Sequence, residues 1–258
     1  MDWLEALAIF AAGTAAGTIN TLVGSGTLIT FPTLLAFGYP PVTANISNNI
    51  GLVPGGMSGS FGYREELRGQ RGRILRLGPM SLLGSVTGAV LLLVLPAAAF
   101  TTIVPVLLGL SLVLVVIQPW MQDKLQQRRD RNGKSEPGRR HGLLTAGCTF
   151  GAGVYGGYFG AAQGILLIGL LGILLPEPLQ RLNALKNVLS LIVNSVAAVT
   201  FALLAFGRID WAVVGLIAAG SLLGGFVGAG VGRRLPSVAL RGLIVVVGIV
   251  AIWRILTS

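Results

Sequence analysis

The chain has 258 residues, of which 53% are hydrophobic and 11% are charged, and its mean hydropathy is +0.80. Soluble domains carry about 25% charged residues, so this composition, with its repeated apolar runs, indicates an integral membrane protein with little extramembrane mass. The formal net charge is +10, but 12 of the 19 Lys and Arg residues lie within residues 64–76 and 124–140, which is typical of cytoplasmic loops and argues against nucleic acid as a partner.

The first half of the chain is predicted to contain an apolar helix, a short apolar piece, a helix with a polar start and an apolar hairpin. In chain order these segments are residues 3–23, 28–37, 42–63, 77–95 and 100–118. A Gly-Ser-Gly-Thr break at residues 24–27 separates the first two. The short piece is too short to cross a core of ~30 Å at about 1.5 Å per residue. Residues 119–141 are predicted to be a polar, flexible loop.

The same order recurs after that loop. The second set of segments is residues 142–159, 165–175, 178–206, 211–231 and 238–255, with a Gly-rich break at 160–164. Setting Gly26 on Gly164 and Asn48 on Asn187 aligns the two halves, and duplicated interrupted segments are typical of secondary transporters. We therefore predict an all-α polytopic membrane protein with two homologous repeats, short broken or re-entrant helices and roughly 8–10 membrane segments. The predicted parts are membrane repeat 1 (1–118), a basic cytoplasmic linker (119–141) and membrane repeat 2 (142–258).

The distribution of Lys and Arg leaves two arrangements of the halves open. If the short pieces cross the membrane, each half has five segments, the halves are inverted and both termini lie outside, with 16 basic residues inside and Arg208 and Arg254 outside. If the short pieces are re-entrant, each half has four crossings, the halves are parallel and the termini lie inside, with 14 basic residues inside and four outside. The positive-inside rule favours the inverted arrangement, and both are kept.

Lys186 is a lone cation within the third predicted segment of the second half. Asn183, Asn187, Ser190 and Asn194 recur around it at spacings of three and four, which places them in one polar stripe on a helix. A lysine near the bilayer centre costs roughly 2.5–3.5 kcal/mol, so an embedded lysine usually faces a cavity and has a partner. We interpret Lys186 as the centre of an anion site inside the membrane. The alternative is a lysine near the helix start that snorkels to the headgroups.

Two further groups of residues are predicted to complete this site. A helix that begins after a Gly-rich turn presents free N–H groups and the positive end of its dipole, which favour an anion. The polar helix starts add Asn and Ser donors, although such residues also serve as structural hydrogen bonds between helices. The predicted substrate-binding residues are Gly24, Ser25, Gly26, Thr27, Asn45, Asn48, Asn49, Gln163, Gly164, Asn183, Lys186, Asn187 and Ser190. Tyr155, Tyr158 and Asn20 flank the breaks, where an aromatic is more typical of packing.

The sequence shows no nucleophile–base pair, no metal-ligand cluster and no nucleotide-binding loop. We therefore expect no enzymatic activity, no metal and no cofactor, and the absence of a G-x-x-x-x-G-K-[ST] pattern does not support ATP-driven transport by this chain alone. The expected partners are a small anionic substrate, such as sulfite or a sulfonate, and the lipid bilayer. Homo-oligomerisation is left open.

Each half carries a Gly-rich helix with a Gly turn and a short apolar piece, followed by a helix start rich in Ala, Asn and Ser or Lys. The first half reads GTAAGTINTLVGSGTLITFPTLLAFGYPPVTANISNNIGLVPGGMSG, and the second reads GAGVYGGYFGAAQGILLIGLLG and RLNALKNVLSLIVNSVAA. In these motifs the chain resembles the TauE/SafE family of sulfite and organosulfonate exporters, and Lys186-Asn187 matches a frequent Lys-Asn pair of that family.

The resemblance implies a secondary transporter that exports a small sulfur-containing anion, sulfite or an organosulfonate, across the cell inner (cytoplasmic) membrane. Its site would lie at the midplane between the two repeats. Two alternatives stay open. One is an importer or exchanger of another small organic or inorganic anion, and the other is a non-transporting membrane scaffold subunit.

Overall fold

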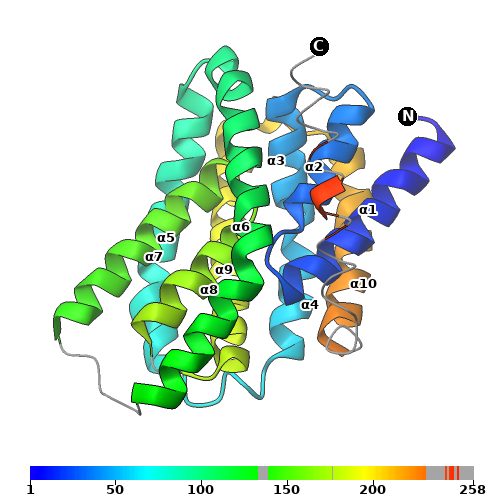
Figure 1. Ribbon diagram of the computed structural model, residues 1–258. Coiled ribbons are helices and arrows are strands. Elements are labelled where there is room, and N and C mark those ends of the chain that lie inside the picture. Colours follow the sequence, from blue (N-terminus) through cyan, green and yellow to red (C-terminus); the bar gives the residue numbers. More distant parts are fainter. Residues whose placement is uncertain (133–138, 176, 231–241, 243, 247–248, 250–258) are drawn as a thin grey trace.

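The computed structural model describes residues 1–132, 139–175 and 177–230, together with 242, 244–246 and 249, and this part of the chain contains helices and turns but no strand (Figure 1). The helices are α1 (Trp3–Leu22), α2 (Thr27–Ala36), α3 (Pro41–Gly51), α4 (Val53–Gly62), α5 (Arg71–Val94), α6 (Ala97–Asn132), α7 (Arg139–Tyr158), α8 (Gln163–Leu174), α9 (Leu179–Leu204), the 3-10 turn η1 (Phe206–Arg208) and α10 (Trp211–Gly230). Four of them, α5, α6, α9 and α10, are long and apolar enough to cross a membrane. The predicted all-α membrane class is confirmed, and the segment predicted at 238–255 is described only at residues 242, 244–246 and 249, which are helical.

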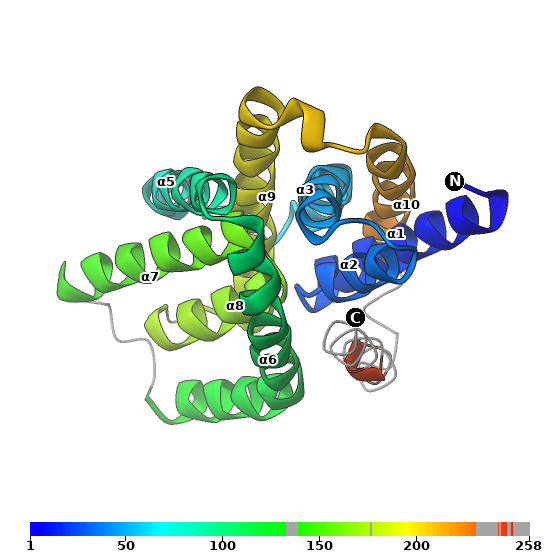
Figure 2. The same ribbon diagram turned by 90° about the horizontal axis from the view of Figure 1, so that it is seen from above.

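Two predicted segments differ from the structure. The flexible loop predicted at 119–141 is wrong over its first part, because α6 continues through Pro119 to Asn132 and changes direction along its length (Figure 2). Proline kinks a helix as readily as it ends one, and the residues after it are mostly good helix formers. The single segment predicted at 42–63 is two helices, α3 and α4, joined at Leu52, with Pro54 in the first turn of α4, where a missing N–H costs little.

The short helices α2 and α8 each form a hairpin with the helix that precedes them. α2 has 10 residues and α8 has 12, so they are about 15 and 18 Å long and neither can span ~30 Å. The chain after α2 returns to the start of α1, since the Tyr39 hydroxyl donates to Glu5 Oε1 at 2.8 Å. Figure 1 shows α7 and α8 as a second hairpin that enters from the opposite end of the molecule.

The corresponding helices of the two predicted halves run in opposite directions. α3 and α10 begin at one end of the molecule, where the Asp210 amide donates to Ser47 Oγ at 2.9 Å. α5 and α9 begin at the other end, where Gln70 Nε2 donates to the Arg181 carbonyl at 2.9 Å. The structure therefore combines the short-helix hairpins of the re-entrant arrangement with the opposite helix directions of the inverted arrangement. Both predicted arrangements counted α1 and α7 as full crossings, but each of these helices shares a hairpin with the short helix after it. The homology of the two repeats stays a prediction.

The first helix of each half packs against the other half. α1 lies along α10, and α7 lies along α5, with small residues at both interfaces. A Cβ on Gly13 would lie 3.0 Å from Ile217 Cα, and a Cβ on Gly153 would lie 2.8 Å from the Ser81 carbonyl oxygen. Such small-residue contacts let helix backbones approach closely inside a membrane. The interlocked halves bring the ends of the two hairpins toward each other.

Candidate functional site

The Gly-rich breaks of the two hairpins touch each other. The Gly164 amide donates to the Gly24 carbonyl at 3.1 Å, and a Cβ on Gly24 would lie 2.5 Å from Gly164 Cα. Gly24 also has a φ of +89°, which residues other than glycine rarely adopt. A Cβ on Gly164 would lie 2.8 Å from Lys186 Cδ, so the lysine side chain passes directly beside this junction.

Lys186 is 1% exposed, and its ammonium group contacts the last turn of α1. Its Nζ donates to the Asn20 carbonyl at 2.9 Å and to the Thr21 carbonyl at 3.3 Å. The last carbonyls of a helix lack intrahelical partners and lie at the negative end of its dipole, so they favour a cation. The alternative in which Lys186 snorkels to the headgroups is wrong, because the side chain is buried against α1.

The two asparagines that flank Lys186 on α9 reach the same helix end. Asn183 Nδ2 and Asn187 Nδ2 each donate to the Thr21 carbonyl at 3.3 Å. Thr21 O thus receives one ammonium and two amide donors, all from the second half of the chain. The predicted polar stripe of α9 therefore faces the end of α1 and contributes positive charge and N–H groups there.

The polar start of α3 is divided between the two halves. Asn45 Nδ2 donates to the Tyr158 carbonyl at 3.0 Å, in the last turn of α7, which mirrors the bond from α9 to α1. Asn48 stays within its own half, since its Nδ2 donates to Thr27 Oγ1 at 3.3 Å and its Oδ1 accepts a hydrogen bond from Thr30. Asn48 and Thr27 thus lie apart from the group around Lys186.

Several predicted residues keep an unpaired polar atom in the interior. Among the described residues no hydrogen-bond partner is found for Ser25 Oγ, Asn45 Oδ1, Asn49 Oδ1, Gln163 Nε2, Asn183 Oδ1 and Ser190 Oγ. Buried polar groups are almost always paired, so these atoms are the ones that a polar solute can satisfy. Gly26 instead serves packing, because a Cβ there would lie 2.5 Å from the Ala16 carbonyl oxygen.

Sequence reasoning missed two residues of α6 that reach the breaks. Gln118 is 1% exposed, and its Nε2 lies 3.5 Å from the Val23 carbonyl oxygen at the first break. Ser111 Oγ donates to the Ala161 carbonyl at 3.1 Å at the second break, and the Tyr155 hydroxyl donates to the same carbonyl. Polar residues seven apart lie on one face of a helix, and this spacing within an apolar segment was the available signal.

The side chains that meet at the junction are hydrogen-bond donors, and the anion site predicted from the sequence stays a prediction. Their charged member is an ammonium and the other donors are side-chain amides. The free N–H groups predicted at the start of α8 are not found, because the amides of Gln163, Gly164 and Ile165 already bond to backbone carbonyls. No group of three His, Cys, Asp or Glu side chains that could hold a metal ion occurs in the described part of the chain. The arrangement can bind and release a small solute.

Comparisons with known proteins agree with this architecture. The family model described as "Sulfite exporter TauE/SafE" matches residues 9–255. The chain is 27% identical to "Probable membrane transporter protein YfcA" of Escherichia coli K12, over 96% of this chain and 88% of the relative. It is also 27% identical to "Probable membrane transporter protein ORF9" of Sinorhizobium sp, over 97% of this chain and 92% of the relative, and 27% identical to a "Probable membrane transporter protein" of Haemophilus influenzae, over 94% and 91%.

No solved structure matches the chain significantly. The family and the names of the relatives point to a membrane transporter rather than an enzyme. The chain is a multi-pass protein of the inner membrane, with four helices long and apolar enough to cross it. As a transporter it handles a small solute. The family predicted from the Gly-rich breaks and the Lys-Asn pair is confirmed: the chain belongs to the TauE/SafE family and is a membrane transporter.

Proposed function

We propose that the protein exports a small sulfur-containing anion, sulfite or an organosulfonate, through the group of donors around Lys186. The observation that carries the proposal is a buried ammonium that, within the described part of the chain, bonds only to uncharged carbonyls, at 2.9 and 3.3 Å, where the two hairpins meet. The description of the matching family as sulfite exporters supports a sulfur oxyanion as the substrate.

The donors fit an oxyanion by number and charge. The Lys186 ammonium has three N–H bonds to offer, and the amides of Asn183 and Asn187 add uncharged donors beside it. Hydrogen bonds between charged partners are about twice as strong as neutral ones, so a sulfite or sulfonate oxygen competes well with the Thr21 carbonyl for these donors. Ser190, whose hydroxyl has no partner among the described residues, lies one turn further along α9.

The membrane potential supplies a driving force for export. Moving one charge through 100 mV is worth about 2.3 kcal/mol, so an inside-negative potential drives an anion outward. None of the carboxylates whose burial the structure describes, Asp2, Glu5, Glu65, Glu66, Asp123, Glu177 and Asp210, is fully buried. None is placed as an embedded proton carrier, which favours potential-driven export over carboxylate-relayed proton coupling.

The test is anion flux from proteoliposomes that contain the purified protein and an imposed potential. Efflux is screened with sulfite, thiosulfate, sulfoacetate, taurine and carboxylates, for the wild type and for Lys186→Gln and Lys186→Ala. We expect flux of a sulfur oxyanion to fall roughly 10- to 150-fold in both variants, because a charged hydrogen-bond donor is lost.

The control variant is Lys124→Gln, which removes an exposed cation that lies over the Trp120 ring, at 5.2 Å from its centroid. Thermal melts in detergent establish that each variant is folded before its flux is compared. Undiminished flux in folded Lys186→Gln and Lys186→Ala would remove the lysine from the transport mechanism. Uptake that exceeds efflux under every potential would favour an importer or exchanger.

A further inference from the structure

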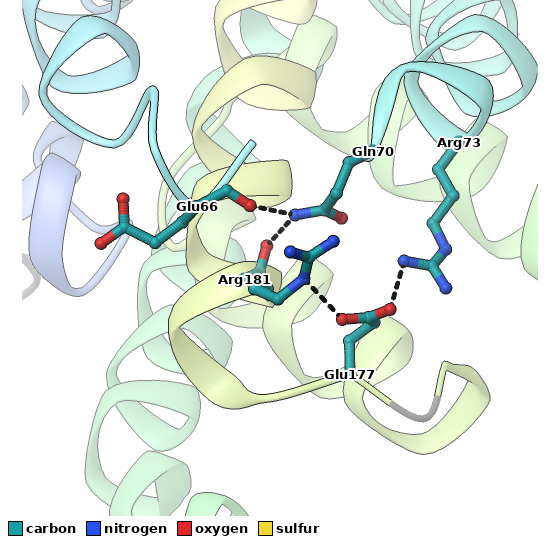
Figure 3. A network of polar contacts seen from close by, with 5 residues as sticks. All are labelled: Glu66, Gln70, Arg73, Glu177 and Arg181. Atoms are coloured by element: carbon teal, nitrogen blue, oxygen red, sulfur yellow. Dashed lines mark hydrogen bonds and ion pairs between the residues drawn. The ribbon is translucent and has the colours of Figure 1, made fainter. Parts of the chain in front are cut away.

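A second group of charged residues joins the two halves at the end of the molecule where α5 and α9 begin (Figure 3). The Glu177 carboxylate, in the turn before α9, accepts from Arg73 Nη1 at 2.6 Å and from Arg181 Nε at 2.7 Å. Gln70 lies beside them and donates to the carbonyls of Glu66 and Arg181, at 2.9 Å each. Arg73 and Gln70 belong to the first half of the chain, whereas Glu177 and Arg181 belong to the second.

This cluster is accessible and holds its carboxylate in the charged form. The side chains of Arg73 and Arg181 are 34% and 32% exposed, and that of Glu177 is 17% exposed. Burial acts to raise the pKa of Glu177, but the hydrogen bonds and positive charges of the two arginines outweigh it and lower this pKa below its usual value. Two guanidinium groups thus surround one internal anion, and together the three groups carry one net positive charge.

The opposite end of the molecule is built differently. The alignment of Gly26 with Gly164 places Tyr39 at the position of Glu177, each in the turn that follows a short helix. The Tyr39 hydroxyl donates to Glu5, which belongs to the same half. Among the described residues, ion pairs between the halves occur only at the Glu177 end.

We propose that Arg73 and Arg181 form an entry site for a small oxyanion on the side of the basic loop, and that the Glu177 carboxylate fills this site until an arriving anion displaces it. This inference rests on the proposed function, since the anion then moves on to Lys186. A carboxylate and a sulfur oxyanion offer the same negatively charged oxygens to a guanidinium group, so one can replace the other. Displacement breaks the Arg73–Glu177 bond between the halves and unlocks that end of the molecule.

The position of the cluster on α9 supports this route. Arg181 and Lys186 belong to the same helix, five residues apart, which corresponds to roughly 7.5 Å along its axis. The residues between them include Asn183, whose Nδ2 is the next side-chain N–H donor on this face of α9 and bonds to the Thr21 carbonyl at 3.3 Å. An anion released from the arginines therefore meets the next donors within about one and a half helical turns.

The experiment measures opening directly and does not require that the transported anion be known. Ser190→Cys places a thiol deep on α9, in a background with Cys148→Ser, which removes the native cysteine. An impermeant anionic methanethiosulfonate is added to inside-out vesicles, where it reaches the basic-loop side. We expect Glu177→Gln to raise the labelling rate at least about tenfold, because it removes the internal anion that holds both arginines.

Glu65→Gln is the matched control, because Glu65 lies in the connection between α4 and α5 that also carries Gln70 of the cluster, and its side chain is exposed. Equal labelling rates for Glu177→Gln and Glu65→Gln overturn the proposal. Glu177→Asp, which keeps the charge, should label at a rate near that of the parent, whereas a rate equal to that of Glu177→Gln would reduce Glu177 to a packing role and also overturn it.

The anion dependence is the second measurement. Sulfoacetate added to the vesicles should raise the labelling rate with Glu177 in place more than sodium chloride does at the same ionic strength, which controls for screening of the ion pairs. Sulfoacetate should not raise the labelling rate more than sodium chloride does in the double variant Arg73→Gln/Arg181→Gln. Equal effects of the two salts overturn the displacement step. Loss of flux in Lys186→Gln with unchanged labelling behaviour separates the two sites, so that failure of one proposal is distinct from failure of the other.

Discussion

The break after α1 and the break after α7 are built alike but are held by different partners. At the first, the carbonyls of Asn20 and Thr21 accept hydrogen bonds from Lys186 and two asparagines of α9. At the second, the Tyr158 carbonyl accepts from Asn45 of α3, and its surroundings are neutral. At both breaks an asparagine amide from the other half bonds to a carbonyl at the end of the preceding helix, and Lys186 adds a cation at the first break.

The difference between the breaks lies in one position of the polar helix starts. Counted from Gly26 and Gly164 without a gap, Asn48 falls at the position of Lys186, one residue before the Asn187 on which the sequence alignment sets it, yet Asn48 bonds to hydroxyl groups of its own half. A buried charge is tolerated only where it has suitable partners, and the unpaired carbonyls at the end of α1 provide them for Lys186. One ammonium also balances one monovalent anion, whereas a second would have no counter-charge. We infer that the amide bridge common to both breaks joins the halves, and that Lys186, which is added at one break, serves the proposed substrate.

Asn48→Lys tests whether the first half can accept a cation and has the largest expected effect. The new ammonium would face the Thr27 and Thr30 hydroxyls, which cannot replace its hydration. We expect a loss of about 4 kcal/mol in the free energy of unfolding, measured by denaturation in mixed micelles. Asn48→Met has a similar length without the charge and should lose much less. Equal losses for the two variants would show that size, rather than charge, distinguishes the halves.

Gly24→Ala tests the direct contact between the breaks. Gly24 and Gly38 both have positive φ values, +89° and +86°, so alanine is strained at either position. A Cβ on Gly24 would lie 2.5 Å from Gly164 Cα, whereas a Cβ on Gly38 meets nothing within 4 Å. We expect Gly24→Ala to lower the free energy of unfolding by about 3 kcal/mol and Gly38→Ala by about 1 kcal/mol. Similar losses in both variants would argue that the breaks are not packed together.

Hydropathy and chain breakers were enough to predict most helices of this fold. The short helix predicted at 165–175 is α8, Gln163–Leu174, and the one predicted at 28–37 is α2, Thr27–Ala36. The helical end of α6 was missed because charged residues after a proline have the composition of a loop, although most are good helix formers. The positive-inside rule favoured opposed directions of the halves, but it could not predict the two hairpins, since it locates loops and cannot distinguish a hairpin from two crossings.

The candidate site was predictable in its residues but not in its partners. Spacing on a helix placed Lys186, Asn183 and Asn187 on one face, and the structure brings all three to Thr21 O. That acceptor is a backbone carbonyl from the other half of the chain, and no side-chain pattern marks such an atom. Gln118 was missed for a similar reason, because its contact is the backbone of Val23.

Asn45→Ala and Asn183→Ala compare the two amide bridges between the halves. Asn45→Ala would remove the side-chain donor that bonds to the Tyr158 carbonyl, whereas Asn183→Ala leaves Thr21 O with Lys186 and Asn187. An unpaired buried acceptor costs more than the loss of one of several donors, so we expect losses of about 2 and about 1 kcal/mol in the free energy of unfolding. Denaturation in mixed micelles measures both, and the reverse order would show that the second break has another donor.

Ser85→Ala and Ser221→Ala test whether the two interfaces beneath the breaks are equivalent, and have the smallest expected effect. Ser85 Oγ of α5 donates to the Val193 carbonyl at 2.7 Å, and Ser221 Oγ of α10 donates to the Gly51 carbonyl at 2.8 Å. Each bond joins the fourth predicted segment of one half to the third predicted segment of the other, α5 to α9 and α10 to α3. Each alanine should lower the free energy of unfolding by about 1 kcal/mol, and the double variant by their sum, since the two bonds share no residue. A loss confined to one serine would mean that the two interfaces contribute unequally to the fold.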